Sequence, residues 1–378
     1  MSERAGNRIA AAKRIVLKIG SALLVDDKTG RIRRDWLDAL ADDVAACRKA
    51  GQEVVIVTSG AIAAGRRLLG LEGTALRLEE KQAAAAAGQV RLAHAYQESL
   101  ARHDITAAQV LVTLSDTEER RRHLNARATL LTLLEMGAVP VINENDTVAT
   151  EEIRFGDNDR LGARVAQMVS ADTLVLFSDI DGLYTANPKT DAAAKHLAEI
   201  REITPEIMAM AGAPISADSR GGMITKLEAA KIAFGAGCRM AIADGRIQNP
   251  LGALSRGARC TWFLPPAEPR TARKRWIASA ILSGGAVTVD AGAAKALRGG
   301  RSLLPAGVVA IEGRFRRGDA IMVRDQSGHE IARGLSAYSA EDAALIKGRR
   351  SADIEAVLGY RGRDELIHRD DLVVTERA

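Results

Sequence analysis

The chain has 378 residues, of which 47% are hydrophobic and 27% are charged, and its formal net charge is +5. This balance excludes a disordered chain, and the length exceeds one ordinary hydrophobic core, so we expect two domains. No apolar run resembles an export signal or reaches the roughly 20 residues of a membrane span, which favours a cytoplasmic protein without membrane contacts. The cysteines, Cys47, Cys238 and Cys260, lack metal-ligand spacing, and we expect reduced packing residues.

Short apolar runs alternate with amphipathic segments in the larger part of the chain. The predicted helices include 35–50, which Gly51 closes, and the alanine-rich segment 79–101. The runs are continuously apolar, as strands covered on both faces should be, and they span 14–20, 53–60, 108–113, 138–143, 173–179 and 238–245. This alternation predicts an α/β fold, an αβα sandwich with a mostly parallel sheet. Ligands of such folds gather beyond the carboxyl ends of the strands.

Polar residues interrupt or follow the first two predicted strands. Lys18 lies within IVLKIGS, where a buried ammonium is costly unless it reaches an anion, although a lysine at a strand end can also extend to water. The second strand runs into TSGAIAAGRR, so Ser59 and Gly60 lie at a predicted helix N-terminus. That position suits a carboxylate, or simple helix capping by the serine. Arg66 and Arg67 stand where a Walker A loop needs lysine and a hydroxyl residue, which excludes that loop.

Two polar clusters follow the fourth predicted strand. Asn143, Asn145 and Asp146 form the first, and GDND at 156–159 forms the second, at the start of a predicted helix. One helix cap needs only one residue, so capping leaves most of these side chains unexplained. Their number predicts a site for a cationic ligand group or for Mg²⁺.

Two further loops carry polar residues and glycines. SDIDGLY at 178–184 leaves the fifth strand and suits a nucleotide base or ribose, or a plain Asp-Gly turn. SRGGMITK at 219–226 places a glycine pair before Lys226 and a helical run, which can cover phosphates or form a loop with a solvated lysine. Two lysines, several acids and glycine loops at one sheet edge are what phosphoryl transfer requires, because the protein must position and neutralise the phosphates.

The chain changes character near PPAEPRTARKRW at 265–276. We place a linker at 267–276, between a domain 1–266 and a domain 277–378. From Arg270 onward, 19 basic and 14 acidic residues account for the whole net charge, a modest bias compatible with RNA. Short alternating segments separated by glycine turns predict a small β-rich unit with one or two helices, and they span 285–290, 307–313, 319–325 and 329–336.

With these motifs in place, the sequence resembles the glutamate 5-kinases of the amino acid kinase family, followed by a PUA domain. The motifs that carry the resemblance are KIGS, VIVTSGAIAAGR, KQAAAAAGQ, PVINENDTVAT, FGDND, SDIDGLYTANP and GGMITKLEAA. INEND followed by GDND is highly specific, and the similarity covers nearly the whole chain. It implies transfer of the ATP γ-phosphate to the side-chain carboxylate of L-glutamate, the first step of proline synthesis, with Mg²⁺ accompanying the nucleotide.

The resemblance also implies roles for individual residues. Lys18 and Lys226 would flank the transferring phosphoryl group, and Asp159 would hold both lysines in place. Asp146 suits the free α-ammonium of glutamate, a charge that an N-acetylated substrate lacks. The residues implied to bind glutamate are Ser59, Gly60, Asp146 and Asn158. The residues implied to bind ATP are Lys18, Ser178, Asp179, Gly221, Gly222, Met223 and Lys226.

Other partners are implied with less support from the residues themselves. They are proline as a feedback inhibitor, a second copy of the chain in a dimer or tetramer, and RNA at the PUA domain. The C-terminal unit has few aromatic residues for base stacking, so a structural or oligomerisation role is at least an equal expectation. Arg220 and Ile224 depart from the usual family loop, with an effect that the sequence leaves open. The alternatives are another kinase of this fold, acting on aspartate, N-acetylglutamate, carbamate or a nucleoside monophosphate, and an RNA-binding protein with a vestigial kinase domain.

Overall fold

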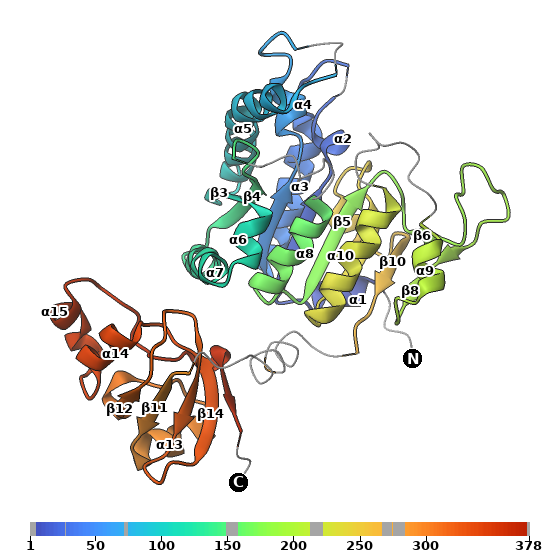
Figure 1. Ribbon diagram of the computed structural model, residues 1–378. Coiled ribbons are helices and arrows are strands. Elements are labelled where there is room, and N and C mark those ends of the chain that lie inside the picture. The colour runs from blue at the N-terminus through green and yellow to red at the C-terminus, as the bar shows by residue number, and fades with distance from the viewer. Residues whose placement is uncertain are drawn as a thin grey trace. The chain divides into compact units, whose positions relative to one another are not determined.

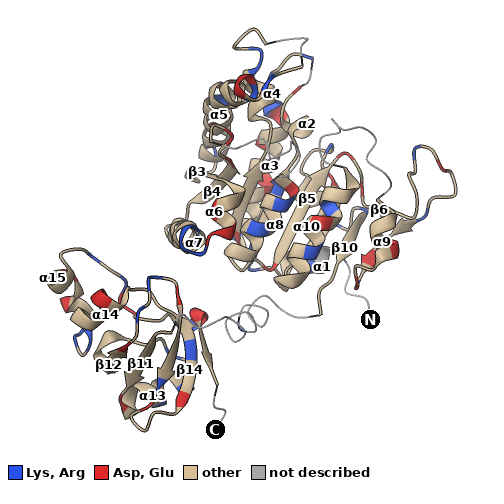
Figure 2. Ribbon diagram, in the orientation of Figure 1, with Lys and Arg blue, Asp and Glu red and all other residues tan. Residues whose placement is uncertain are grey.

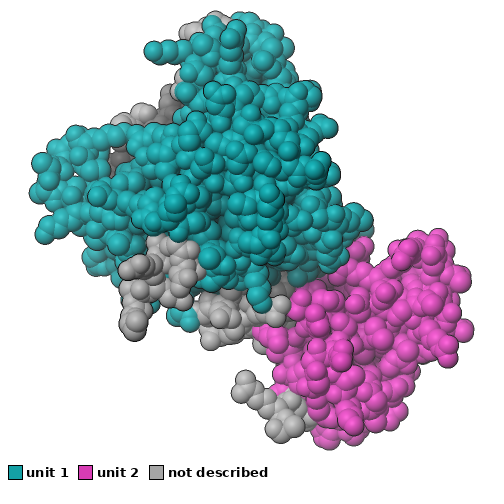
Figure 3. Space-filling view, turned by 180° about the vertical axis from the view of Figure 1, so that it is seen from behind, with its two compact units in different colours: residues 1–269 teal, residues 270–378 magenta. Residues whose placement is uncertain are grey.

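The computed structural model describes residues 5–26, 28–71, 75–148, 158–211, 222–266, 274 and 284–375. The chain divides into two compact units, Met1–Pro269 and Arg270–Ala378, which Figure 3 shows in different colours. The predicted linker at 267–276 lies outside the described residues, except for Lys274. The domain bounds 1–266 and 277–378 therefore stay a prediction.

An eight-stranded sheet forms the centre of the first unit (Figure 1), with the strand order β3-β4-β2-β1-β5-β9-β10-β8. Six strands correspond to the predicted runs: β1 (Arg14–Ile19), β2 (Glu53–Thr58), β3 (Ala107–Val112), β4 (Val139–Glu144), β5 (Thr173–Ser178) and β9 (Arg239–Asp244). All pairs among these six are parallel. Two strands were not predicted: β10 (Cys260–Phe263), antiparallel to β9, and the short β8 (Glu199–Ile200). The α/β fold with a mostly parallel sheet is confirmed.

Helices cover both faces of this sheet, and the two faces bury separate apolar clusters. The helices of the first face are α1 (Ala5–Ala10), α3 (Arg34–Lys49), α5 (Leu78–Ala101) and α11 (Pro250–Ser255). Those of the second face are α7 (Arg120–Glu135), α8 (Asn158–Met168) and α10 (Met223–Gly235). The remaining short elements of this unit are α2 (Ser21–Leu24), α4 (Ala61–Gly65), α6 (Leu114–Glu118), α9 (Pro205–Ala209), β6 (Leu183–Tyr184) and β7 (His196–Leu197).

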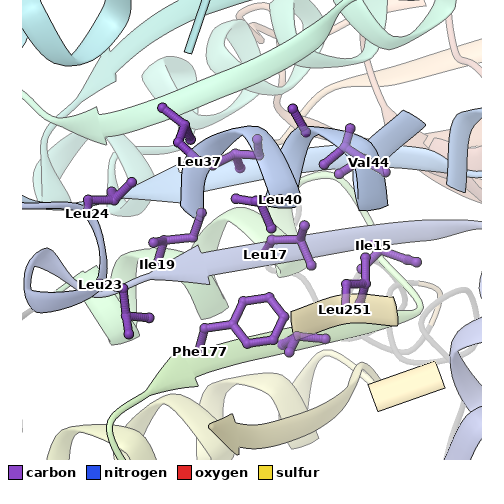
Figure 4. Packing of buried hydrophobic residues seen from close by; sticks show 14 of the residues in the cluster. Ile15, Leu17, Ile19, Leu23, Leu24, Leu37, Leu40, Val44, Phe177 and Leu251 are labelled. Carbon is purple, nitrogen blue, oxygen red and sulfur yellow. The ribbon is translucent and has the colours of Figure 1, made fainter. Parts of the chain in front are cut away.

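The alternation of side chains along β1 decides what Lys18 can reach. Leu17 and Ile19 belong to the cluster of the first face, with Leu37 of α3 (Figure 4). Val16 belongs to the cluster of the second face, with residues of α8 and α10. Because side chains two residues apart in a strand point the same way, Lys18 shares the face of Val16. The fold therefore directs this lysine toward α8 and α10.

Helices α4 and α5 approach each other closely at two glycines. A Cβ on Gly88 would lie 1.8 Å from the carbonyl oxygen of Ala61, and a Cβ on Gly65 would lie 1.8 Å from that of Ala84. Real Cβ atoms do not approach backbone oxygens so closely, so any side chain at either position would push the helices apart. The packing of α5 against the segment that follows β2 therefore depends on these glycines.

We expect Gly88→Ala to lower the free energy of unfolding by about 1–3 kcal/mol, the range for overpacking a well-packed interior. Gly235→Ala is a matched control, because Gly235 ends α10 and no atom lies within 4 Å of its Cβ position. Alanine also favours the helix more than glycine does, so this control is expected to be neutral or slightly stabilising. Urea unfolding of both variants checks the prediction, and a Gly88→Ala protein as stable as the wild type would contradict it.

The second unit is built on a five-stranded sheet with the order β12-β11-β13-β14-β15. Its strands are β11 (Ala286–Val289), β12 (Val308–Glu312), β13 (Ala320–Arg324), β14 (Glu330–Leu335) and β15 (Leu372–Val374). Its α-helices are α13 (Ala291–Arg298), α14 (Ala340–Ile346) and α15 (Ile354–Leu358), and single 3₁₀ turns occupy Pro305–Gly307, Ser351–Asp353 and Arg369–Asp371. These three helices among the described residues exceed the expected one or two, because helices of five to eight residues give little periodic signal.

Ion pairs engage some of the basic residues of this unit. Arg333 lies 2.6 Å from Glu330, and Arg324 lies 3.2 Å from Glu312. Figure 2 shows basic and acidic residues together on β14. Each pair removes one charge of each sign, so the net excess of the unit is unchanged, but these two arginines are less available to contact a nucleic acid.

The fold also bears on the cysteines and on membrane spans. Cys47, Cys238 and Cys260 are buried and free, as predicted. Within the described residues, no helix combines the length and the apolar character needed to cross a membrane.

Candidate active site

Two lysines that are distant in sequence meet one carboxylate. The Nζ of Lys18 on β1 lies 2.5 Å from Oδ1 of Asp159, and the Nζ of Lys226 on α10 lies 3.1 Å from Oδ2 of the same residue. The three residues are 8%, 5% and 0% exposed, in the order Lys18, Lys226, Asp159. Asp159 stands in the first turn of α8, so the face to which β1 directs Lys18 also carries its partners. We call this group the Lys-Asp-Lys cluster.

The charges of the Lys-Asp-Lys cluster do not cancel. Burial by itself would raise the pKa of Asp159, but the charges and hydrogen bonds of Lys18 and Lys226 outweigh it and hold this pKa well below its usual range. With the carboxylate ionised and both lysines protonated, one positive charge remains in a buried place. An unbalanced buried charge is costly, and a highly anionic group such as a phosphate would balance it.

Two further residues adjoin the Lys-Asp-Lys cluster, and neither was among the residues predicted from the sequence. Thr225 donates a hydrogen bond from Oγ1 to Oδ2 of Asp159 at 3.0 Å. Gly162 lies against the stem of Lys18, and a Cβ there would be 3.3 Å from the Lys18 Cβ, tighter than most real contacts. The position of Thr225 directly before Lys226 was a usable signal, whereas only the packing of α8 on β1 reveals Gly162.

Asn158 forms hydrogen bonds with residues at the ends of two strands beside this cluster. Its Nδ2 faces three oxygens, at 2.7 Å from the Ser59 hydroxyl, 2.9 Å from the Thr58 carbonyl and 3.3 Å from Oδ1 of Asn143. Thr58 ends β2, and Asn143 lies near the end of β4. Since Asn158 and Asp159 are consecutive, this second cluster adjoins the Lys-Asp-Lys cluster.

The hydroxyl of Ser59 faces Asn158 instead of capping a helix. Gly60 is the N-cap of α4 and adopts a left-handed backbone conformation with φ of 102°, which favours glycine. No side chain caps this helix. Of the two interpretations of Ser59, simple helix capping is therefore excluded.

Asp146 lies just beyond β4, at the edge of the sheet that Ser59 also occupies, because β2 and β4 are parallel neighbours. Burial raises the pKa of the Asp146 carboxyl to about 6. The raised pKa means that burial destabilises the ionised form of this carboxyl, and a nearby cation would stabilise it. An ammonium group of a ligand would supply one.

The residues implied for the nucleotide lie at the ends of β5 and α10. Ser178 ends β5, the neighbour of β1, and its hydroxyl donates to Oδ1 of Asp179 at 3.2 Å. Gly222 is the N-cap of α10 and Met223 is its first residue, one turn before Lys226. Gly221, like Arg220 and Asp157, lies outside the described residues.

Side chains that commonly bind metal ions are not clustered among the described residues. Among them, no group of three or more acidic, histidine or cysteine side chains is arranged to hold a metal ion. The carboxylate in the centre of the cluster, Asp159, is already paired with two lysines.

Comparisons with known proteins show the family to which the chain belongs. The model of the amino acid kinase family matches residues 13–244. The glutamate 5-kinase of Paramagnetospirillum magneticum is 65% identical over 97% of this chain and 99% of its own length. The chain belongs to the glutamate 5-kinases of the amino acid kinase family. The enzyme of Agrobacterium fabrum that carries this name is 61% identical over 98% of this chain and 95% of its own.

The remaining comparisons concern the second unit and the fold. A PUA domain model matches residues 285–358 of this kinase family member. The solved structure of carbamate kinase from Giardia lamblia bound to AMP-PNP has a TM-score of 0.50 and 15% identity, covering 68% of this chain and 99% of its own. At this identity the likeness supports the fold alone. The resemblance inferred from the motifs, including the PUA domain, is confirmed.

Proposed function

We propose that this protein transfers the γ-phosphoryl group of ATP to the side-chain carboxylate of L-glutamate, giving γ-glutamyl phosphate and ADP, the first step of proline synthesis. The observation that carries the proposal is the Lys-Asp-Lys cluster, buried directly beside Asn158. Use of ATP follows from membership of a kinase family. Glutamate as the acceptor is supported by the near full-length relatives that are named glutamate 5-kinase.

The chemistry makes few demands on the protein. An oxygen of the glutamate side chain forms a bond to the γ-phosphorus, while the bond from this phosphorus to the β-γ bridging oxygen breaks and ADP leaves. Carboxylic acids of this kind are ionised near neutral pH, so no base is needed to remove a proton. What remains is to orient the two reactants and to neutralise the charge of the moving phosphoryl group. Lys18 and Lys226 would do the second, with Asp159 keeping both ammonium groups in register.

The amino acid end of the substrate would be held at the neighbouring cluster. Asp146 would pair with the α-ammonium, and Asn158 would contact the same end of glutamate. Ser59 and Gly60, beyond β2, suit the α-carboxylate. The nucleotide would lie against Ser178 and Asp179 and would contact Gly221, Gly222 and Met223, with Lys18 and Lys226 at its γ-phosphate.

We expect KM for glutamate at pH 5 to be about ten times its value at pH 7, because a carboxyl with a pKa of about 6 is mostly neutral at the lower pH. Only the ionised Asp146 attracts an ammonium, so affinity is present above this pKa and lost as the pH falls through it. Asp146→Asn is expected to raise KM for glutamate and to abolish its pH dependence. KM for ATP serves as the internal control. The same pH profile in wild type and Asp146→Asn would contradict the assignment.

A hydroxamate assay tests the proposed function directly. Hydroxylamine traps an acyl phosphate as a hydroxamate, so the purified protein is incubated with ATP, Mg²⁺, hydroxylamine and one candidate acid. We expect product with L-glutamate and none with aspartate or N-acetylglutamate; carbamate and nucleoside monophosphates are compared by ADP release. Activity with one of these other acceptors alone would select another kinase of the fold. No turnover with any acceptor would favour the RNA-binding alternative.

Several finer properties of the family stand as proposals beside this one. Mg²⁺ would arrive with ATP, proline would compete at the glutamate site, and the protein would act in the cytoplasm as a dimer or tetramer. Light scattering tests the oligomer, and a proline titration at low glutamate tests the inhibition. RNA binding by the PUA unit would show salt-sensitive affinity, and affinity that is independent of salt would argue against it.

A further inference from the structure

Helix α5 contacts the amino acid site with two buried polar side chains to which the family resemblance gave no role. Gln89 is 8% exposed and Tyr96 is 1% exposed. They lie seven residues apart, so they share one face of α5. Burying a polar group is costly unless it finds a hydrogen-bond partner. Each of these two side chains finds its partner at the end of a strand that leads into the site.

Gln89 holds the side chain of Asn143 in one orientation. Its Oε1 accepts a hydrogen bond of 2.8 Å from Nδ2 of Asn143. Asn143 consequently turns Oδ1 toward Nδ2 of Asn158, at 3.3 Å. If Asn143 were turned over, two NH₂ groups would face each other, because an amide nitrogen can only donate. Because Oε1 of Gln89 accepts from Nδ2 of Asn143, Oδ1 of Asn143 stays directed toward Nδ2 of Asn158.

Tyr96 supports the other side of the same asparagine. Its hydroxyl shares a hydrogen bond of 3.0 Å with Oγ1 of Thr58. The backbone of Thr58 provides the carbonyl that accepts from Nδ2 of Asn158 at 2.9 Å. Ser59, whose hydroxyl also faces this nitrogen, is the next residue in the chain. Tyr96 thus fixes the end of β2 on which two of the three contacts of Asn158 depend.

These contacts decide which end of the Asn158 amide is left for a ligand. A backbone carbonyl can only accept, so the group that faces Thr58 must be the NH₂. Oδ1 then occupies the opposite end, where it is buried and has no hydrogen-bond partner among the described residues. A buried acceptor without a donor is costly, and such positions persist where a ligand brings the donor.

We infer that helix α5 positions the amino acid site: Gln89 through Asn143, and Tyr96 through Thr58, orient Asn158 so that its Oδ1 accepts a hydrogen bond from the α-ammonium of the substrate. The inference rests on the proposed function. Neither Gln89 nor Tyr96 touches the reacting atoms, so both are positioning residues. Their effect must appear in the discrimination between substrates with and without an amine, which a merely structural role would leave unchanged.

Glutarate provides this comparison, because it is glutamate without the amine and its acyl phosphate is trapped as a hydroxamate in the same way. We expect Gln89→Leu to lower kcat/KM for glutamate about tenfold, the effect of one hydrogen bond to a charged group, and to leave kcat/KM for glutarate within about twofold. Gln89→Glu keeps an oxygen facing Asn143 and is expected to recover most of the loss. Gln97→Leu makes the same chemical change on the exposed side of α5 and is expected to behave as the wild type.

Two further variants separate positioning from damage to the fold. Tyr96→Phe removes only the hydroxyl and is expected to shift the glutamate to glutarate ratio in the same direction, which keeps the test open if Gln89→Leu does not fold. In an Asn158→Ala background, Gln89→Leu is expected to cause no additional loss. The inference would be overturned if Gln89→Leu lowered kcat/KM equally for glutamate and glutarate, or if Tyr96→Phe left the ratio of the two unchanged. A full additional loss from Gln89→Leu in the Asn158→Ala background would also overturn it. Absence of hydroxamate from the wild type with glutamate would instead refute the proposed function itself.

Discussion

Replacing Lys226 by alanine is expected to lower kcat by about 10²- to 10³-fold, the usual effect of removing one preorganised donor from a transition state. Lys226 would neutralise phosphoryl oxygens as their charge shifts during transfer, so the loss should appear mainly in kcat and less in KM for glutamate. The fold should survive, because Asp159 keeps Lys18 as its partner at 2.5 Å. Steady-state hydroxamate kinetics with varied ATP and glutamate measure both constants.

The matched control for this variant is Lys231→Ala. Lys231 lies on the same helix, α10, with its side chain exposed, and it is expected to keep wild-type kcat. Lys18→Ala should resemble Lys226→Ala, since both ammonium groups meet the same carboxylate. A decrease of less than about threefold in kcat for both variants would remove both lysines from the reaction.

Asp159→Asn is expected to damage stability as well as activity. Asparagine preserves the shape of the side chain but leaves two buried ammonium groups without a counter-charge, and breaking a buried pair in this way costs about 3–5 kcal/mol. We expect a lower free energy of unfolding by about this amount, together with a large decrease in kcat. Urea unfolding and hydroxamate kinetics measure the two effects. Asp35→Asn, exposed in the first turn of α3, is a control that should cost less than about 1 kcal/mol.

The pH dependence of stability offers a separate check on Asp159. The lysines depress the pKa of this carboxyl in the folded state, so its contribution is present above the ordinary pKa of an aspartate, about 3.9, and lost as the pH falls further. The wild type should therefore lose stability in acid through this group, and Asp159→Asn should lack that part of the loss. Adding Lys226→Met to Asp159→Asn removes one of the two uncompensated charges and should restore part of the stability. Purely additive effects of the two substitutions would argue against the cluster.

Much of the fold was predictable because its signals are local. Continuous apolar runs predicted the six parallel strands within one or two residues at most ends, and Gly51, with φ of 78°, follows α3 as expected. The strands β8 and β10 were missed because they are short: β8 has two residues, and β10 has four, which are all buried but give too brief an apolar run to indicate a strand.

The candidate site was predictable in its composition and only partly in its geometry. Polar residues after parallel strands were expected at one edge, and this placed Lys18, Ser59 and Asp146 correctly relative to the sheet. The sequence could not decide between capping and ligand contact for Ser59, because both need the same hydroxyl at the same position. Only the structure excluded capping, because Gly60 is the N-cap of α4 and the Ser59 hydroxyl faces Asn158, 99 residues away in the sequence; the ligand contact stays a prediction.

By itself, the sequence determined the six parallel strands, the main helices that separate them, the family, and the set of charged residues proposed for phosphoryl transfer, because each follows from neighbouring residues or from whole motifs. Only the tertiary structure decided that Lys18 pairs with one carboxylate oxygen of Asp159 and Lys226 with the other. It also decided that Gln89 and Tyr96 on α5 bond to Asn143 and Thr58, the residues that contact Asn158. These contacts join segments whose distance is set by strand order and helix packing. A buried polar side chain takes its partner from whatever the fold places within hydrogen-bond reach, and no local pattern records which residue that will be.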